Sequence, residues 1–407
     1  MYIKRDLESI VLRLNEQYPA ILITGPRQVG KTTMLKNLMQ GTKRTYVTLD
    51  DLNTRALAKN DPAMFFQLYK PPILIDEVQY APELFTYIKI MIDKEHKAGD
   101  FWLTGSQIFK LMGGVRESLA GRIAILNLSS LSQNEIYNKC ENSLFSLDFL
   151  FLMQKQQNIK NSDTLEIFSR IFKGSMPSIV SGVYKDINIF YSSYLSTYIE
   201  RDIKELSGEI DSLLFMKFIT AVACRVSQIV NYAEIARDCD INQTTAKKWL
   251  SILEALGLIF YLQPFSNNAL TRTIKTPKLY FYDTGLVAYL TKWSSAKTLE
   301  AGAMNGAIFE NYAVSEIVKS YYNNALSPFI YYYRDKDMKE IDVIIEKDGK
   351  LFPIEIKKSA NPNTNLTNAF KLLDKGNLVR GTGAVLCMSN ELSAVNKDNL
   401  IIPVSLI

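Results

Sequence analysis

Histidine is nearly absent from this sequence, since the 407 residues include one, at position 96. Catalytic triads that use histidine, and zinc sites with several imidazole ligands, are therefore nearly excluded. His96 itself stands in the polar stretch DKEHK, where we expect a solvent-exposed helix end. Catalysis by this chain would instead use carboxylates, lysines, backbone amides and metal ions bound through oxygen.

Cysteine is sparse, and long apolar runs are missing. The four cysteines are scattered and form no Cys-x-x-Cys pair, which favours buried, reduced thiols in a cytoplasmic protein. No segment approaches the roughly 20 uncharged apolar residues of a membrane span. The first residues alternate charged and aliphatic side chains, unlike a signal peptide. We therefore expect a cytoplasmic protein with no membrane partner.

Charge of one sign does not dominate either. Lysine and arginine number 47 and aspartate and glutamate 42, which gives a formal net charge of +5. This balance permits a nucleic-acid partner without arguing for one. Hydrophobic residues make up 47%, as in ordinary globular proteins, so a disordered or collagen-like chain is excluded. At about 100–200 residues per domain, the length predicts two to four domains.

Short, almost wholly apolar runs in the first 130 residues predict strands that alternate with helical patterns. Strands that are buried on both faces have this composition. We therefore expect an α/β fold, in which helices cover a mostly parallel sheet. The predicted strands are 20–24, 45–49, 72–75, 101–104 and 123–128.

The segment GPRQVGKT follows the first predicted strand directly and precedes a helical pattern. It matches G-x-x-x-x-G-K-[ST], a loop whose backbone amides cradle phosphates at a helix N-terminus. We expect Lys31 to contact the β and γ phosphates as a catalytic group, and Thr32 to offer its hydroxyl to Mg²⁺. The expected nucleotide-binding residues of the loop are Gly25, Pro26, Arg27, Gln28, Val29, Gly30, Lys31, Thr32 and Thr33.

The apolar run PILI ends in two carboxylates, Asp76 and Glu77. Both would lie at the carboxyl edge of the sheet, where ligands bind in open α/β folds. We expect Asp76 to hold Mg²⁺ together with Thr32. Glu77 is the expected general base that polarises the attacking water.

Four segments of this region together resemble the prokaryotic AAA-family ATPases that carry a DUF4143 C-terminal region: GPRQVGKTTMLKNL, ILIDEVQYAPELF, FWLTGSQ and ESLAGRIAILNLSSLS. The later segments YIERDIKEL, LYFYDTGLVAYL and GAIFENYAVSEI also resemble that family. The resemblance covers most of the chain and is weakest over 135–190. It implies ATP binding and slow hydrolysis, and says more about fold than about biological role.

The resemblance also implies two further polar positions, each with an alternative. In ATPases of the AAA+ kind, the strand beside the acidic strand ends in a polar sensor of the γ-phosphate, for which Thr104 and Ser106 are the candidates. Arg122, or Arg116 nearby, would stabilise charge on the transferring phosphoryl group, in the same chain or from a neighbouring subunit. A surface salt bridge is the alternative role for either arginine.

A helix–turn–helix pattern is expected between residues 232 and 256, followed by an apolar strand over 257–262. In the second helix Ala246, Leu250, Leu253 and Leu256 are expected to face inward, and the spacing resembles a winged helix. The opposite face would be able to contact DNA phosphates and base edges, although a structural or protein-docking role is the favoured alternative. The residues of this face are Gln243, Thr244, Lys247 and Lys248.

Carboxylates and a lysine recur near the C-terminus. Asp342 in EIDVII precedes IEIK, in which Glu355 and Lys357 point to the same face of a strand. With Glu310 from an earlier helix, the pattern resembles the PD-(D/E)xK restriction-endonuclease-like fold. In such a site Asp342 and Glu355 would bind Mg²⁺, Glu310 would assist and Lys357 would orient water. This fold also occurs in proteins that only bind, so cleavage stays open.

These patterns together predict four consecutive segments. They are an AAA+-type P-loop ATPase domain (1–135), a helical region (136–210), a winged-helix-like domain (211–265) and a DUF4143, nuclease-like domain (266–407). The predicted function is Mg²⁺-dependent ATP hydrolysis whose nucleotide state is coupled to the later modules, acting on DNA. The alternatives are an ATP-gated DNA nuclease and a non-catalytic nucleotide-sensing protein. A protein partner and a homo-oligomer are left open.

Overall fold

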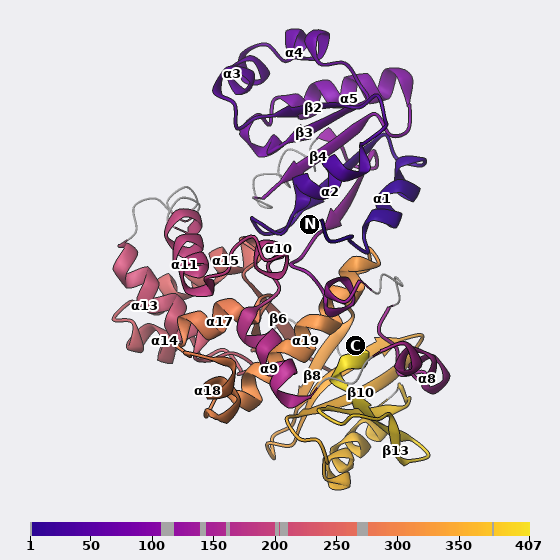
Figure 1. Cartoon of the computed structure of the whole chain (residues 1–407), viewed down its shortest axis with the longest axis vertical. Coiled ribbons are helices and arrows are strands. Elements are labelled where there is room, and N and C mark those ends of the chain that lie inside the picture. The colour runs from indigo at the N-terminus through magenta and orange to yellow at the C-terminus, as the bar shows by residue number, and fades with distance from the viewer. Residues whose placement is uncertain are drawn as a thin grey trace.

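The structure is a computed structural model that describes residues 2–106, 118–138, 144–159, 163–199, 203, 211–266, 276–376 and 378–407. Figure 1 shows a helix-covered sheet formed by the N-terminal part of the chain at one end of the molecule. The later helices and the C-terminal sheet lie together at the other end. The chain therefore has two large bodies, and the phosphate-loop motif belongs to the first.

All pairings in the N-terminal sheet are parallel, in the order β2-β3-β4-β1-β5. The order places β1, which leads into the predicted phosphate loop, between β4 and β5. The parallel sheet predicted from the apolar runs is thereby confirmed. The strands are β1 (Ala20–Thr24), β2 (Thr45–Thr48), β3 (Ile73–Asp76), β4 (Phe101–Gly105) and β5 (Ile123–Asn127).

Successive residues of these strands enter two different cores, because side chains alternate across a sheet. Leu22 packs in the core that includes residues of α3, α4 and α5, whereas Ile21 and Ile23 pack with α1 and α2. Burial on both faces explains why the strands are apolar throughout. The helices are α1 (Glu8–Asn15), α2 (Lys31–Leu38), α3 (Leu52–Asn60), α4 (Pro62–Leu68) and α5 (Leu84–Glu95).

The ends of these helices follow from individual side chains. Asp51 and Asp61 cap α3 and α4, each accepting a 2.8 Å hydrogen bond from a backbone N–H of the first turn. At the other end of the layer, α5 stops at His96, which takes a left-handed conformation and is exposed. The predicted exposed position of His96 is confirmed.

The middle of the chain is mainly helical. Many of its helices begin after an aspartate or asparagine whose side chain caps the first turn; the caps are Asp148, Asp163, Asp186, Asp211, Asn231 and Asn242. The elements are α7 (Gln133–Ile136), α8 (Phe149–Asn158), α9 (Thr164–Lys173), α10 (Pro177–Val180), α11 (Ile187–Tyr194), the π-helical turn η2 (Leu195–Ile199), α13 (Ser212–Ala223), α14 (Tyr232–Asp238) and α15 (Gln243–Ala255).

The expected helix–turn–helix segment is present as α14 and α15, which contact each other. The four residues of the second helix that were predicted to face inward are all buried. The strand that follows, β6 (Ile259–Pro264), pairs antiparallel with β7 (Lys278–Phe281) and parallel with β8. The strand after the helix pair is therefore part of the C-terminal sheet.

In the described part of the chain that sheet has nine strands in a mixed arrangement, in the order β13-β14-β12-β10-β9-β8-β6-β7, with β11 paired to β10. Its remaining strands are β8 (Ile330–Arg334), β9 (Glu340–Lys347), β10 (Lys350–Lys357), β11 (Val379–Arg380), β12 (Gly383–Cys387), β13 (Ser393–Asn396) and β14 (Asn399–Pro403). The accompanying helices are α17 (Thr284–Leu290), α18 (Ala296–Ala301), α19 (Asn305–Asn323), and the 3₁₀ segments η3 (Thr364–Lys375) and η4 (Val404–Leu406). A restriction-endonuclease-like assignment for this sheet stays a prediction.

One hydrophobic core joins the helical middle to the C-terminal sheet, running from Phe145 to Ile407. Consequently the segments predicted as 136–210, 211–265 and 266–407 share a core, and the boundary at 265/266 divides the β6–β7 hairpin. Three cysteines fall in the described residues and are free, but Cys224 is exposed, where burial was expected. No helix in the described ranges has the length and apolar character needed to cross a membrane.

Candidate functional site

The loop between β1 and α2 wraps tightly at two glycines. Gly25 has φ +138°, and a Cβ there would lie 2.0 Å from the Leu128 carbonyl oxygen, so only glycine fits. Gly30 is left-handed, with φ 94°, and is followed by the first turn of α2. The buried Lys31 begins that helix, and its Nζ donates to the Gly25 and Pro26 carbonyls at 2.9 and 2.7 Å. The loop therefore has the conformation that a phosphate cradle requires.

Asp76, at the end of β3, collects hydroxyl donors from three other elements. Thr32 of α2 donates to Asp76 Oδ1 at 2.6 Å, and Thr104 of β4 donates to the same oxygen. The Tyr46 hydroxyl of β2 donates to Oδ2 at 3.2 Å. Burial, and then the charge of Asp76, raises the pKa of Tyr46 to about 12, so this phenol stays a proton donor. Thr32 and Asp76, the predicted Mg²⁺ ligands, are therefore in direct contact.

Glu77 is the next residue and has a left-handed backbone, with φ 56°. Its N–H donates to Thr104 Oγ1 at 3.2 Å, while its Oε2 accepts from Ser106 Oγ at 3.2 Å and from the Gln79 amide. Both sensor candidates thus touch the acidic pair, Thr104 through Asp76 and Ser106 through Glu77. Gln79 was missed by sequence reasoning; the short 3₁₀ turn η1 (Val78–Tyr80) carries it back toward Glu77.

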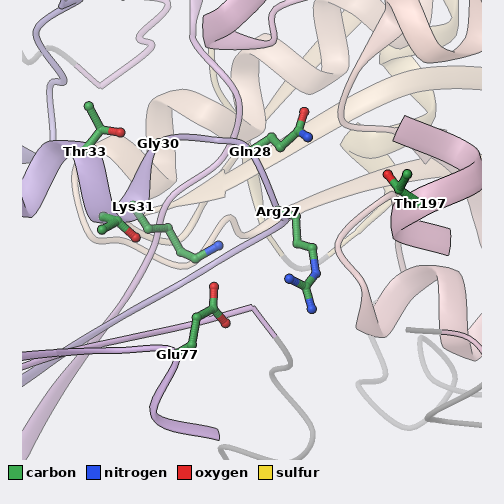
Figure 2. A pocket seen from close by; sticks show the side chains of 8 residues that line it. Arg27, Gln28, Gly30, Lys31, Thr33, Glu77 and Thr197 are labelled. Carbon is green, nitrogen blue, oxygen red and sulfur yellow. The ribbon is translucent and has the colours of Figure 1, made fainter. Parts of the chain in front are cut away.

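A cavity of about 380 Å³ lies over the loop and Glu77. Figure 2 shows Lys31 and Arg27 extending toward the space above the Glu77 carboxylate, with Thr197 of η2 on the opposite side. Thr197 was also missed, because no local pattern in the sequence indicates that η2 lies beside the phosphate loop. The cavity therefore has one wall from the helical middle of the chain.

A second cavity of about 550 Å³ shares Gln28, Gly30 and Thr33 with the first. The shared residues make the two cavities neighbours along the loop. Its further lining is largely apolar and aromatic, with Tyr2, Ile3, Val29, Pro177, Val183 and Tyr184. The combined site thus has a polar, charged end and an apolar end.

The donor set at the polar end fits a nucleotide with Mg²⁺. A hydroxyl and a carboxylate, from Thr32 and Asp76, are oxygen ligands of the kind Mg²⁺ uses alongside water and phosphate oxygens. Lys31 and the amides at the start of α2 supply the positive potential for phosphates. The residues present therefore suit the pair of ligands that the loop motif predicts.

The structure places one of the two arginines that were predicted to act on the γ-phosphate, Arg122. Arg122 directly precedes β5, whose first residue pairs with Ala20, the first residue of β1. It therefore stands at the edge of the sheet opposite the phosphate loop, where its Nε lies 2.5 Å from Asp93 Oδ1 at the surface. The structure does not bring Arg122 to the phosphate loop of its own chain. Arg116 lies outside the described residues.

The four residues predicted for a nuclease-like centre do meet, on α19, β9 and β10. Lys357 Nζ lies 2.7 Å from Glu355 Oε1 and 3.5 Å from Asp342 Oδ2. A second lysine, Lys278 of β7, approaches Glu310 Oε1 at 3.1 Å and Asp342 Oδ1 at 3.7 Å. Lys278 was overlooked, although a charge at the start of the buried strand KLYF is a signal of a buried ion pair.

Burial, and next the charge of Asp342, raises the pKa of both Glu310 and Glu355 to about 7. The lysines act in the opposite direction on these carboxyl groups without cancelling the effect. Across the ranges described, no three or more His, Cys, Asp or Glu side chains form a group that could hold a metal ion. The carboxylates that were predicted as metal ligands are thus close together, but they contact Lys278 and Lys357.

The face predicted to contact DNA is exposed on α15. Its four residues, Gln243, Thr244, Lys247 and Lys248, are all exposed. Lys247 Nζ lies 5.2 Å from the centre of the Tyr232 ring of α14. Two other basic residues of this helical group, Lys217 and Arg225, pair with Asp240 and Asp238. The exposed positive charge here is therefore modest.

Arg5, another residue that sequence reasoning missed, is buried between the phosphate loop and the segment after β5. It donates to the Val29 carbonyl at 2.7 Å and to the Ser129 carbonyl at 2.8 Å, and its Nε lies 2.9 Å from Glu135 Oε1. Because the pair is buried, each partner needs the other's charge. Arg5 thus fixes the position of the loop relative to the chain that leaves the first sheet.

Comparison with known families assigns three segments. Residues 17–137 match an AAA domain model, residues 164–297 match a domain of unknown function, DUF8612, and residues 305–407 match another, DUF4143. The first and third matches confirm the resemblance found in the sequence. The second had no counterpart among the predictions and spans both the helical middle and the β6–β7 hairpin.

Two curated relatives, from Mycobacterium bovis and Mycobacterium tuberculosis, are each 27% identical over 372 residues. The alignment covers 91% of this chain and 77% of each relative, and both are described as uncharacterized proteins. A Walker-type ATPase of Pyrococcus abyssi is similar with a TM-score of 0.46 and 14% identity, over 71% of this chain and 96% of that one. The Holliday junction branch migration motor RuvB of Thermotoga maritima is similar with a TM-score of 0.31 and 16% identity. That match covers 63% of this chain and 85% of the RuvB chain.

Proposed function

Because the chain carries an AAA domain at its N-terminal part and a DUF4143 region at its C-terminus, we propose that it is an ATPase that binds ATP with Mg²⁺ and hydrolyses it to ADP and phosphate. The observation that carries this proposal is that Lys31, Thr32 and Glu77 line one cavity beside the phosphate loop, while Asp76 accepts a 2.6 Å hydrogen bond from Thr32. Lys31 and Thr32 begin α2, and Asp76 and Glu77 stand at the carboxyl end of β3, so the parallel sheet brings the two pairs to one edge.

The phosphate loop supplies most of the binding. Lys31 is buried and now donates to two carbonyls of its own loop, so its ammonium group is already fixed near the place where phosphate oxygens would replace those acceptors. The amides from Gly30 to Thr33 lie at the start of α2, where the helix dipole favours negative charge. Together they hold the β and γ phosphates in this proposal.

Thr32 and Asp76 would hold Mg²⁺, which when bound neutralises part of the charge on the β and γ phosphates. The contribution of the protein is orientation. Thr104 and Tyr46 donate to the two oxygens of Asp76, so the carboxylate cannot rotate without losing a hydrogen bond. These contacts support Thr104 as one of the two sensor candidates, with the specific role of positioning the Asp76 carboxylate.

Glu77 is the proposed general base. Its carboxylate lines the cavity, and its backbone conformation differs from that of the strand, which turns the side chain out of the sheet edge. Gln79 and Ser106 hold Oε2, so the remaining oxygen is the one available to orient water. In this assignment Gln79 and Ser106 are positioning residues.

Arg27 is the proposed source of positive charge at the γ-phosphate. It lines the same cavity as Lys31 and Glu77, and Figure 2 shows its guanidinium in the space between the loop and Glu77. An arginine in this place can stabilise the charge that develops on a transferring phosphoryl group. Within one chain, Arg27 thus replaces Arg122, which is engaged with Asp93 at the far edge of the sheet.

The apolar cavity next to the loop would take the adenine base. It begins at Gly30 and Thr33, and the side chains of Tyr2, Val183 and Tyr184 give it an apolar and aromatic lining. Such surfaces favour a flat heteroaromatic ring. Because Val183 and Tyr184 belong to the helical middle, nucleotide binding would touch both bodies of the molecule.

Coupling between the nucleotide site and the later modules is supported by direct contacts at the loop. A Cβ at Gly257, in the turn between α15 and β6, would lie 2.9 Å from Pro26 Cγ, so this turn abuts the phosphate loop. Thr197 lines the phosphate cavity from η2. A rearrangement of the loop on binding would therefore press on the strand that enters the C-terminal sheet.

A second connection passes through the segment after β5. Arg5 ties Glu135 to the loop, and the neighbouring Gln133 N–H donates to Glu316 of α19 at 2.7 Å. Lys319 of α19 donates to the Leu131 carbonyl at 3.0 Å. These buried polar contacts connect the nucleotide-binding domain to the DUF4143 region and support nucleotide-dependent motion of that region.

DNA is the proposed partner because Gln243, Thr244, Lys247 and Lys248 are exposed together on α15, the second helix of the α14–α15 pair. Docking of a protein on this surface is the alternative. The test is one assay on the purified full chain with Mg²⁺ and ATP, in which phosphate release is followed with and without duplex DNA. Phosphate release that DNA stimulates supports the whole proposal, release that ignores DNA supports the ATPase alone, and no release contradicts it.

A further inference from the structure

The ammonium group of Lys278 is surrounded by carboxylates in the C-terminal cluster. Its Nζ lies 3.1 Å from Glu310 Oε1 and 3.7 Å from Asp342 Oδ1, and it also contacts Glu340 Oε1. The Lys278 side chain is only 4% exposed. A buried ammonium needs compensating negative charge, and these three side chains from α19 and β9 supply it.

The oxygens that a nuclease metal would use are largely engaged with lysines and backbone. Asp342 Oδ2 accepts from the Ile356 N–H at 2.9 Å and lies 3.5 Å from Lys357 Nζ. Glu355 Oε1 lies 2.7 Å from the same Nζ, while Glu355 Oε2 is buried with no hydrogen-bond partner in the described structure. A divalent ion that approached this oxygen would meet Lys357 at the same carboxylate, and one that approached Asp342 would meet both Lys357 and Lys278; these ammonium groups repel it.

The side chain of Lys278 stays protonated, and its backbone is held in β7. Burial alone would lower the pKa of Lys278, but Glu310, Asp342 and Glu340 together raise it above the ordinary value. The backbone of Lys278 is fixed as well, because it pairs with Leu262 of β6 and bridges to Ile229. The side chain is therefore a charged, anchored group and cannot be treated as a mobile surface lysine.

We propose that Lys278 is the built-in cation of this centre, so that the C-terminal module binds no divalent metal there and does not cleave DNA. The ion pairs instead clamp β7 to α19 and β9. Lys278 lies in the segment that matches DUF8612, and its partners lie in the segment that matches DUF4143. The cluster thus joins two family segments of the chain, and this inference does not depend on the proposed ATPase function.

The test measures Mn²⁺ binding to the nucleotide-free full chain by electron paramagnetic resonance of the free ion. Wild type and Asp342→Asn should give the same binding curve, because no metal uses Asp342 in the native cluster. Lys278→Met removes the ammonium group with little change in shape, and should gain a Mn²⁺ site on the order of tenfold tighter than anything in wild type. That site should vanish when Asp342→Asn is added. Lys350→Met, at an exposed position of β10, is the matched control and should gain nothing.

Terbium gives a second readout, because the Tyr280 hydroxyl donates to Glu310 Oε1 at 2.8 Å and its ring could sensitise a lanthanide bound in the cluster. Luminescence should appear in Lys278→Met and stay absent in wild type. A Mn²⁺ site in wild type that Asp342→Asn removes would overturn the proposal, as would Mg²⁺-dependent DNA cleavage lost in Asp342→Asn. A folded Lys278→Met that gains no site would also overturn it. If Lys278→Met fails to fold, the Mn²⁺ binding curves of wild type and Asp342→Asn still test the proposal: equal curves support it, and a site lost in Asp342→Asn overturns it.

Discussion

Thr32 donates a 2.6 Å hydrogen bond to Asp76, and this bond connects the phosphate loop to β3 across the intervening strand β4. The two residues are far apart in the sequence, and they meet because parallel strands bring their carboxyl ends to one edge of the sheet. The contact unites the two halves of the proposed Mg²⁺ site. Predictions about the nucleotide site follow from it.

Replacement of Lys31 by alanine should weaken ATP binding by about 10- to 150-fold, because a charge-assisted interaction worth roughly 1.5–3 kcal/mol is lost. Fluorescence of a labelled ATP analogue measures the change. Lys59→Ala, at an exposed position of α3, is the control and should bind as wild type does. Unchanged affinity in Lys31→Ala would refute the assignment of the phosphate loop.

Arg27→Ala should lower kcat by about 10- to 1,000-fold while ATP affinity falls much less, since the guanidinium is proposed to act on charge that develops during phosphoryl transfer. Arg27→Lys should recover part of the rate, and the exposed Arg13→Ala is the control. Turnover per chain should also be independent of protein concentration. A rate that rises with concentration would instead indicate an arginine supplied by a neighbouring subunit.

Gln79→Ala should reduce kcat about tenfold and leave KM nearly unchanged. The reason is that Gln79 holds the Glu77 carboxylate and has no proposed contact with substrate, so its loss costs roughly one hydrogen bond, about 1.5 kcal/mol. Steady-state kinetics separates the two constants. Gln67→Ala, exposed on α4, serves as the control. A rise in KM at constant kcat would argue that Gln79 binds substrate.

The C-terminal cluster should make stability depend on pH. The pKa of Glu310 and of Glu355 is about 7 in the folded chain, above the ordinary value of 4.5. The folded state therefore holds more protons than the unfolded state between these values, and stability falls as pH rises from about 4.5 to about 7. With both residues replaced by glutamine, the free energy of unfolding of the variant minus that of wild type should increase from pH 5 to pH 8 by on the order of 5 kcal/mol, since each pKa unit is worth about 1.4 kcal/mol and two groups are involved.

Thermal unfolding of the two proteins at pH 5, 6, 7 and 8 provides the measurement. A single replacement of Glu346, which is half-buried on the same strand as Asp342 and outside the cluster, by glutamine is the control. The difference between the double variant and wild type is the quantity of interest, because other carboxyl groups cancel in it. A difference that stays constant over this range would contradict the raised pKa values.

The sequence predicted the N-terminal sheet well because burial on both faces leaves a strong local signal. The strand β1 has the predicted bounds, 20–24, and Asp76 and Glu77 come where the apolar run ends. The phosphate loop was equally clear, since its glycines and Lys31 are local in sequence. These features depend on neighbouring residues, and that is why pattern reasoning could find them.

Contacts between distant segments were not predictable in the same way. Gln79 reaches Glu77 through a 3₁₀ turn, and Lys278 reaches Asp342 through the pairing of β6 with both β7 and β8. Neither contact has a spacing rule that a single sequence would show. The expected role of Arg122 failed for the same reason. Its local motif does not indicate which edge of the sheet the arginine occupies, and the structure places it beside Asp93, opposite the phosphate loop.

The most direct test of the account compares Glu77→Gln with wild type in ATP binding and in phosphate release, each with Mg²⁺ and the full chain. The variant should bind ATP about as tightly as wild type, and its turnover should fall by about 10²- to 10⁴-fold, because the carboxylate that polarises water is gone. Glu83→Gln, exposed at the start of α5, should match wild type in both. Undiminished phosphate release by Glu77→Gln would contradict the central claim.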